Sequence, residues 1–327
     1  MQKINLKNIL SNLFNIVTII VTIALASMLF GENNTLIWVA VEVAVLMFMK
    51  IGIEIELKQA TCIVVLLFWL IGFSNKIAMI NPYIGIVVNF ITIFILTYVP
   101  SRKVEEKAYM PFVLCYIFGQ SMATNSENFT SRIVSLIVGS IIVAAFYYFY
   151  NRKTVKSKIK ISNIDIMSDR FILAIKMSLG VTIAMYIGSM FNLQKTLWIA
   201  LSTMSITQIE FKHTKEKFKH RIKSTFIGAI AFVILFQLII PDRYATFATL
   251  VLSYIYTFVQ VYSIQIIFIT VNALSSAMIL FDGVTAIWLR IILVVTGCII
   301  GYLINRIDFK KIFEFFKERK NVLVENN

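Results

Sequence analysis

Long apolar runs follow one another along the chain, and short polar breaks separate them. A helix needs about 20 residues to cross roughly 30 Å of hydrocarbon, so runs of this kind are typical of membrane-spanning helices. The composition agrees, because 59% of the 327 residues are hydrophobic and 15% are charged, against about 25% charged in soluble domains. With four prolines in the sequence, long helices are permitted along most of it. The sequence predicts an all-α integral membrane protein.

Twelve runs are interpreted as membrane-spanning helices, six in each half of the chain. In the first half they are approximately 13–30, 36–49, 59–73, 83–99, 109–123 and 133–150. In the second half they are approximately 171–190, 197–209, 224–240, 245–261, 264–281 and 287–304.

Basic residues gather in every second break. With the amino terminus in the cytoplasm, the lysines and arginines fall mostly in the inner breaks, which are 50–58, 101–107, 151–160, 212–223 and the tail after Arg306. The clear basic residues of the outer breaks are Lys76, Lys195 and Arg243. Cytoplasmic loops of membrane proteins carry an excess of Lys and Arg. We therefore expect a multi-pass plasma-membrane protein with both termini cytoplasmic, whose net charge of +14 requires no nucleic-acid partner.

The two halves share sequence landmarks at nearly constant spacing. LIWVA (36–40) opens the second run and TLWIA (196–200) opens the eighth, 160 residues later. Arg132 followed by Gly139 opens the sixth run, and Arg290 followed by Gly297 opens the twelfth, 158 residues later. Such agreement indicates an internal repeat, and an even number of helices per copy gives both copies one orientation. The predicted fold is about twelve transmembrane helices arranged as two parallel six-helix repeats.

The repeat and the charge pattern divide the chain into four parts. Residues 1–152 form the first six-helix membrane repeat, 153–169 a basic cytoplasmic linker, 170–307 the second repeat and 308–327 a cytoplasmic tail. The tail sets aromatic residues against basic ones, as an amphipathic helix on the inner leaflet would, although a solvated end fits the same pattern.

The second repeat also carries a more specific pattern. A basic residue precedes one helix, LWIALS (197–202) opens the next, and the residues that follow in the pattern are Gln208, Thr214, Arg221, Thr225 and Gly228. This pattern resembles the fusaric acid resistance protein-like family, within the aromatic acid exporter superfamily that also includes plant aluminium-activated malate transporters. The resemblance implies efflux or conductance of organic anions, often aromatic carboxylates, and it leaves the substrate open.

Arg132 and Arg290 are the most informative candidate site residues, because they lie at predicted outer helix entrances, against the inside bias. A pseudo-symmetric pair of guanidinium groups near the central axis would bind an exiting carboxylate. Alternatively, each arginine pairs with a local carboxylate such as Glu127 or Asp282.

Three further residues are substrate-binding candidates. Arg221, at the predicted cytoplasmic mouth of the ninth helix, attracts a carboxylate or simply anchors the helix. Lys176, about a turn and a half inside the seventh helix, contacts substrate or extends to the cytoplasm. Asn272 forms a polar stripe with Ser275 and Ser276 that lines a path or bonds a neighbouring helix.

Glu42 is the candidate for proton coupling. It lies about two turns inside the second helix without a charged counterpart in the other repeat, and a buried carboxylate is costly enough to be a functional candidate. Asn89 and Gln120 are uncharged polar residues inside the fourth and fifth predicted helices.

Metal, cofactor and enzyme chemistry are not predicted. His213 and His220 are the only histidines, and they lack the further ligands that a metal site needs. The sequence has no glycine-rich phosphate loop, and its aspartates fall at helix ends or in loops. We therefore expect no cofactor and no catalysis.

The sequence thus predicts a transporter that exports organic carboxylate anions, aromatic ones among them, through the interface between the two repeats. Its expected partners are the lipid bilayer and a small organic anion, and association of several copies stays open. Two alternatives remain: a passive anion channel, and a membrane subunit or scaffold for a partner protein.

Overall fold

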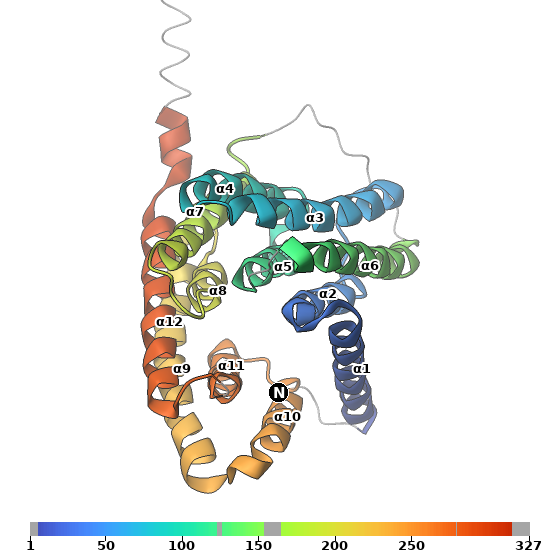
Figure 1. Cartoon of the computed structure of the whole chain (residues 1–327). Coiled ribbons are helices and arrows are strands. Elements are labelled where there is room, and N and C mark those ends of the chain that lie inside the picture. The colour runs from blue at the N-terminus through green and yellow to red at the C-terminus, as the bar shows by residue number, and fades with distance from the viewer. Residues whose placement is uncertain (1–5, 123–125, 154–164, 279, 316–327) are drawn as a thin grey trace, which may run out of the picture.

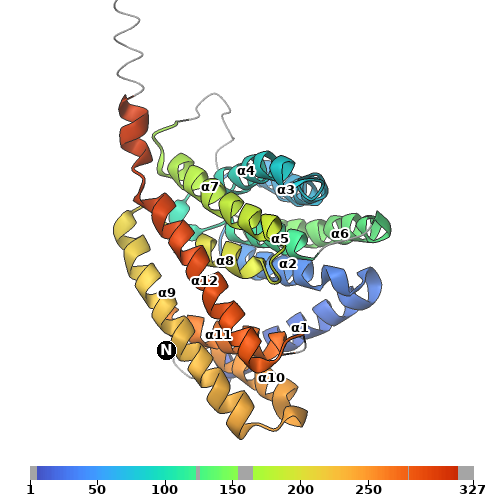
Figure 2. The same cartoon turned by 60° about the vertical axis from the view of Figure 1, so that its left-hand side comes forward.

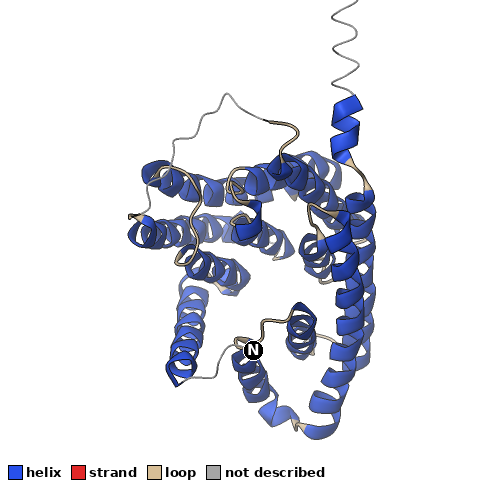
Figure 3. Ribbon diagram, turned by 180° about the vertical axis from the view of Figure 1, so that it is seen from behind, coloured by secondary structure: helices blue, strands red, loops and turns tan. Residues whose placement is uncertain are grey.

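The computed structural model describes residues 6–122, 126–153, 165–278 and 280–315, which form helices and turns and no strand (Figures 1 and 3). The first six α-helices are α1 (Leu6–Phe30), α2 (Thr35–Phe48), α3 (Leu57–Ala78), α4 (Pro82–Tyr98), α5 (Met110–Ser121) and α6 (Ser126–Asn151). The next six are α7 (Asp169–Met190), α8 (Leu197–Ile206), α9 (Phe211–Phe232), α10 (Ala245–Tyr256), α11 (Tyr262–Ala277) and α12 (Gly283–Arg306). The predicted all-α class is confirmed.

Each of the twelve predicted apolar runs overlaps one of these helices. Within the described part of the chain, six helical segments are long and apolar enough to cross a bilayer: Ile9–Phe30, Leu57–Ala78, Asn128–Asn151, Asp169–Met190, Phe211–Ile239 and Gly283–Phe315. The other helices are shorter, as α8 with 10 residues and α5 with 12 illustrate. The chain is therefore a multi-pass membrane protein.

The prediction of a loop at 212–223 is wrong, because these residues are helical in the structure. α9 begins at Phe211 and continues through a π-helical segment, Val233–Ile239, to give one long rod. Lysine and glutamate are good helix formers, and a helix can extend beyond the hydrocarbon when its end is charged. Arg221 therefore lies ten residues inside a helix and not at a loop boundary.

The predicted linker and tail are described only in part. Most of the linker, 154–164, and the last residues, 316–327, lie outside the described residues. Residues 309–315 of the tail are helical, and the Phe313 ring packs against that of Phe171 with centroids 5.9 Å apart. Lys310 Nζ lies 2.7 Å from an Asp169 carboxylate oxygen, and this hydrogen bond raises the pKa of Lys310. The start of the tail is thus attached to α7.

Matching positions of the two halves make matching contacts. In the first half, Gly139 of α6 faces Val41 of α2, and in the second Gly297 of α12 faces α8 at Ile199 and Ser202. The tryptophan that opens each second helix also contacts the sixth: Trp38 Nε1 donates to Ser135 Oγ at 2.9 Å, and Trp198 lies against Arg290. Glycine at these crossings lets the paired helices approach closely.

The two halves meet along a seam, defined here as the contact of α4 with α7 and of α5 with α8. The α4–α7 contact is the most extensive between any two helices in the described structure, and Figure 2 shows α7 running past α4. At one end of the seam, the Phe171 ring packs edge-on against Phe94 and Tyr98, with centroids 5.4 and 6.0 Å apart. Aromatic packing of this kind contributes about 0.5–1.5 kcal/mol per pair beyond area burial.

α1 and α10 lie away from the α4–α7 contact, at the other side of the molecule, and are loosely packed (Figure 1). Ala26 is the one buried residue among the described side chains of α1, and α10 has none. The two helices touch where Tyr254 donates its hydroxyl hydrogen to the Ile9 carbonyl at 3.3 Å. Their apolar side chains are suited to face lipid.

The helix crossing at Gly297 yields the first prediction. A Cβ added at Gly297 collides with the backbone carbonyl oxygen of Ile199, whereas one at Gly139 meets a Val41 methyl group at 2.8 Å, which can rotate away. Gly297→Ala should therefore lower the free energy of unfolding by about 1–3 kcal/mol more than the matched Gly139→Ala. Thermal unfolding in detergent measures the difference, and equal midpoints for both variants would contradict the close α8–α12 approach.

Candidate functional site

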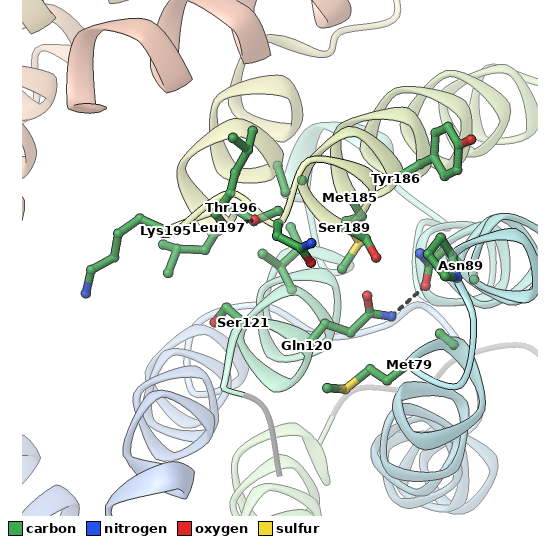
Figure 4. Close-up of a pocket in the computed structure, with 18 of the residues that line it drawn as sticks. Met79, Asn89, Gln120, Ser121, Met185, Tyr186, Ser189, Lys195, Thr196 and Leu197 are labelled. Atoms are coloured by element: carbon green, nitrogen blue, oxygen red, sulfur yellow. Dashed lines mark hydrogen bonds between the residues drawn. The ribbon is translucent and has the colours of Figure 1, made fainter. Parts of the chain in front are cut away.

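A cavity of about 430 Å³ opens in the seam, lined by α3, α4, α5, α7 and α8 (Figure 4). Its volume falls within the range of roughly 300–1,000 Å³ that is usual for small-molecule sites. Its polar lining residues include Asn89, Gln120, Ser121, Ser189, Asn192 and Lys195. Because both halves contribute to its wall, a relative movement of the halves would change its shape.

Local sequence signals shape the entrance of the cavity. Asn81 caps α4 by accepting a hydrogen bond from the Tyr83 amide at 2.8 Å, and Pro82 follows at the first helical position, which suits its missing N–H. Between α7 and α8, Asn192 and Lys195 adopt left-handed backbone conformations with φ of 46° and 59°. Both turns belong to breaks predicted to be extracellular.

Asn89 and Gln120 of the cavity wall form a hydrogen-bonded trio with Tyr116, which is buried behind them and does not line the cavity. The Tyr116 hydroxyl donates to Asn89 Oδ1 at 2.6 Å, and Gln120 Nε2 donates to the same oxygen at 2.5 Å and to the Tyr116 oxygen at 3.0 Å. Asn89 is 4% exposed, so its amide is fixed by these partners. The side-chain amides of Asn89 and Gln120 thus lie beside space that a polar solute can enter (Figure 4).

The charge of the cavity wall is positive. Lys195 is the one charged residue among the described lining residues, and no acidic side chain contributes. Figure 4 shows its side chain at the rim, directed away from Asn89 and Gln120. Lys195 is therefore placed to attract an anion to the entrance, while the neutral amides of Asn89 and Gln120 line another part of the wall.

The other end of the seam is closed by aromatic rings. Phe94, Tyr98 and Phe171 pack together there, Phe313 of the tail joins them, and the Arg170 guanidinium lies 3.7 Å from the centre of the Tyr98 ring. α4 and α7 run in opposite directions, so this end lies at the predicted cytoplasmic side. The polar cavity and the aromatic closure thus occupy opposite ends of one seam.

None of the predicted site residues lines this cavity. Arg132 is 1% exposed and is held by its own half. Its guanidinium donates to the carbonyl oxygens of Gly119 at 2.7 Å, Met122 at 2.7 Å and Asn33 at 2.9 Å, and to Asn34 Oδ1 at 3.2 Å. Arg132 therefore joins α6 to α5 and to the turn before α2.

The structure does not bring Arg132 and Arg290 together as one pair at the central axis, because each is held within its own half. Arg290 lies with its guanidinium carbon 4.8 Å from the Trp198 ring centre. Of the two proposed carboxylate partners, Asp282 forms no ion pair with either arginine in the described part of the chain. Asp282 instead caps α12 by accepting the Thr285 amide hydrogen at 3.0 Å, and hydrogen bonds from the Thr285 side chain and amide lower the pKa of the Asp282 carboxyl. The Glu127 side chain lies outside the described part.

The structure does bring Arg221 close to Arg290, which the sequence did not predict. Arg221 is 5% exposed and donates to Ser205 Oγ at 2.6 Å and to Ser202 Oγ at 3.3 Å, both on α8. Its side chain is therefore directed into the bundle and joins α9 to α8.

The remaining candidates make bonds between elements. Lys176 is 4% exposed and donates to the Ile209 carbonyl at 2.8 Å, so it does not extend to solvent. Asn272 Nδ2 donates to Ser253 Oγ at 3.0 Å, and Ser275 lies 2.8 Å from the Thr249 hydroxyl, which joins α11 to α10. Glu42 is half-buried on α2 beside Thr22 of α1.

The cavity in the seam between the two halves is thus the best candidate for a binding site in this multi-pass membrane protein. The sequence profile of one family, described as Fusaric acid resistance protein-like, matches residues 183–304, from the end of α7 into α12. This match confirms the resemblance seen in the second half of the sequence. The family is one of membrane transport and resistance and not of enzymes. Searches among curated proteins and among solved structures find no match.

The contrast between Arg132 and Arg290 yields the second prediction. Arg132→Lys keeps the charge but loses the planar fork that reaches four acceptors, and each hydrogen bond to a charged group contributes about 1.5–3 kcal/mol. We expect Arg132→Lys to lower the free energy of unfolding by about 3 kcal/mol, and Arg290→Lys to cost clearly less because it gives up no such set of bonds. Thermal unfolding in detergent ranks the two variants, and an equal loss would contradict the role given to Arg132.

Proposed function

We propose that this chain carries organic anions, aromatic carboxylates among them, across the plasma membrane along the seam between its two halves. The observation that carries the proposal is the cavity itself, which lies in the seam, has both polar and apolar residues in its wall, contains Lys195 and has no acidic residue in its described lining. A basic rim with neutral donors behind it favours an anion over a cation. The family match adds support, because the family is one of membrane transport and resistance.

The proposal places the cavity at the outer face, with both termini in the cytoplasm. Support comes from the distribution of basic residues, since the turns around the cavity belong to the outer set of breaks, which holds Lys76, Lys195 and Arg243 while the inner breaks and the tail hold most of the Lys and Arg. The described conformation would then be open outward through the cavity and closed inward by Phe94, Tyr98 and Phe171. Export requires the reverse state, in which these rings separate and an anion enters from inside.

The proposal also keeps twelve crossings arranged as two parallel repeats. The matching α2–α6 and α8–α12 contacts support the repeat, because Gly139 and Gly297 face the second helix of their own half. The shorter helices can cross together with flanking residues or where the bilayer is locally thin. Association into a homo-oligomer is compatible with this arrangement.

The proposal gives other roles to the residues that the sequence predicted to bind substrate. The binding site for the anion near the outer face is formed by Lys195, Asn89 and Gln120, and not by the pair of Arg132 and Arg290. Lys176 and Asn272 bond neighbouring elements in the described state, and they would contact an anion only after a rearrangement.

Proton coupling, if export uses it, is assigned to Glu42, a half-buried acid on α2. Collapsing the proton gradient in loaded proteoliposomes separates a coupled exporter, which loses uphill flux, from a passive channel, which does not. Absence of flux from the correctly inserted chain would instead favour a membrane subunit that needs a partner protein.

The charge of Lys195 yields the third prediction. Lys195→Gln should slow the initial flux of benzoate through proteoliposomes roughly 3- to 10-fold at low ionic strength, because a charge at the mouth concentrates anions there. The loss should shrink towards zero near 1 M salt, where screening acts within about 3 Å. Lys76→Gln is the matched control, since Lys76 lies in another predicted outer turn, over the Phe129 ring and outside the cavity. Equal effects of the two variants would contradict the proposed entrance.

A further inference from the structure

One face of α8 is approached by two buried arginines from different helices. Trp198, Ser202 and Ser205 are spaced four and three residues apart, so they share that face. Arg290 of α12 lies against the Trp198 ring, and Arg221 of α9 donates to the Ser202 and Ser205 hydroxyls. Both guanidinium groups therefore approach the same face of α8 within about two helical turns of each other. Two like charges, one from α9 and one from α12, thus lie against neighbouring turns of α8.

No acid balances these charges in the described part of the chain. The ion pairs there join Lys103, His213, Lys310 and Lys311 to their acids, and neither arginine takes part. A further cation, Lys217, lies 5.3 Å from the Tyr262 ring centre, and the Tyr262 hydroxyl is 3.1 Å from Ser205 Oγ. The surroundings therefore add positive charge.

Both arginines also keep unused donors while buried. Arg290 is 3% exposed and Arg221 5% exposed, and the Nε–H of each lacks a hydrogen-bond partner. Burial of an unpaired charge is unfavourable, and two adjacent like charges add repulsion. Serine hydroxyls and an aromatic ring only partly offset this cost, because they carry no negative charge.

The matched position in the first half shows how a buried arginine is satisfied without an anion. Arg132 donates to three carbonyl oxygens and to the Asn34 side chain. Arg290 occupies the corresponding place on α12 and has no comparable set of acceptors. The first half therefore satisfies its buried arginine largely with backbone carbonyl oxygens, whereas the charge of Arg290 in the second half is left without such acceptors.

We propose that Arg221 and Arg290 hold a small anion between α8, α9 and α12. Two guanidinium groups match a compact anion such as a halide or a carboxylate group. This site is separate from the cavity in the seam, because none of its residues lines that cavity. A bound anion neutralises the pair and so stabilises the packing of the second half.

Trp198 supplies the reporter that tests this site. In a chain with Trp38→Phe, Trp69→Phe and Trp288→Phe, Trp198 is the remaining tryptophan and lies beside Arg290. Iodide quenches indole fluorescence, so titration of the detergent-purified protein at constant ionic strength with gluconate should give saturable quenching. Chloride, which does not quench indole, should compete with iodide.

The controls separate binding from collision. Arg221→Gln and Arg290→Gln in the same background should lose the saturable component, whereas Lys195→Gln should retain it. A chain that keeps only Trp38, the counterpart of Trp198, should show unsaturable quenching alone. Saturable quenching that survives both arginine variants would overturn the proposal.

A second measurement does not depend on whether these variants fold. For the chain with all its native residues, replacing gluconate by chloride should raise the unfolding midpoint in a saturable manner, because a ligand that binds only the folded state stabilises it. Absence of both saturable quenching and this shift would overturn the proposal. Neither readout involves flux, so this result stands apart from the test of transport along the seam.

Discussion

Hydrocarbon offers no hydrogen bonds, and this constraint governs where each polar group of the chain lies. Backbone groups are satisfied within helices, which explains why the described residues form helices and no strand. The same requirement fixes the buried side chains. Arg132 meets four acceptors across three elements, and Lys176 meets the Ile209 carbonyl. Several charges that would be candidates for substrate contact thus hold the bundle together.

Solutes are expected where buried polar groups of the protein lack hydrogen-bond partners or lie beside open space. The seam contains a cavity with amides and hydroxyls beside open space, and it joins the two halves by the contacts of α4 with α7 and of α5 with α8. The second half contains two buried arginines with unused donors. The halves share landmark contacts yet differ here, since Arg132 is satisfied by carbonyls and Arg290 is not.

Much of the fold follows from hydropathy, but contacts between helices do not. Each of the twelve predicted apolar runs overlaps a helix of the described chain, whereas 212–223 was wrongly predicted as a loop because a charged segment has low hydropathy whether it is a loop or a helix. Asn89 and Gln120 were recognisable as polar residues inside helices, and Lys195 as an outer basic residue. Their convergence depends on α4 and α5 packing beside α7 and α8, which no local pattern encodes. The meeting of Arg221 and Arg290 was hidden for the same reason.

The central claim is that anions pass along the seam, and accessibility of a cysteine at Gln120 tests it most directly. In a chain with Cys62→Ser, the rate at which an impermeant thiol reagent modifies Gln120→Cys is compared with and without benzoate. The account predicts that benzoate slows modification and that modification stops flux. Ile292→Cys, 55% exposed on α12 and outside the cavity, should show neither effect. A rate at Gln120→Cys that benzoate leaves unchanged, with flux intact after modification, would contradict the account.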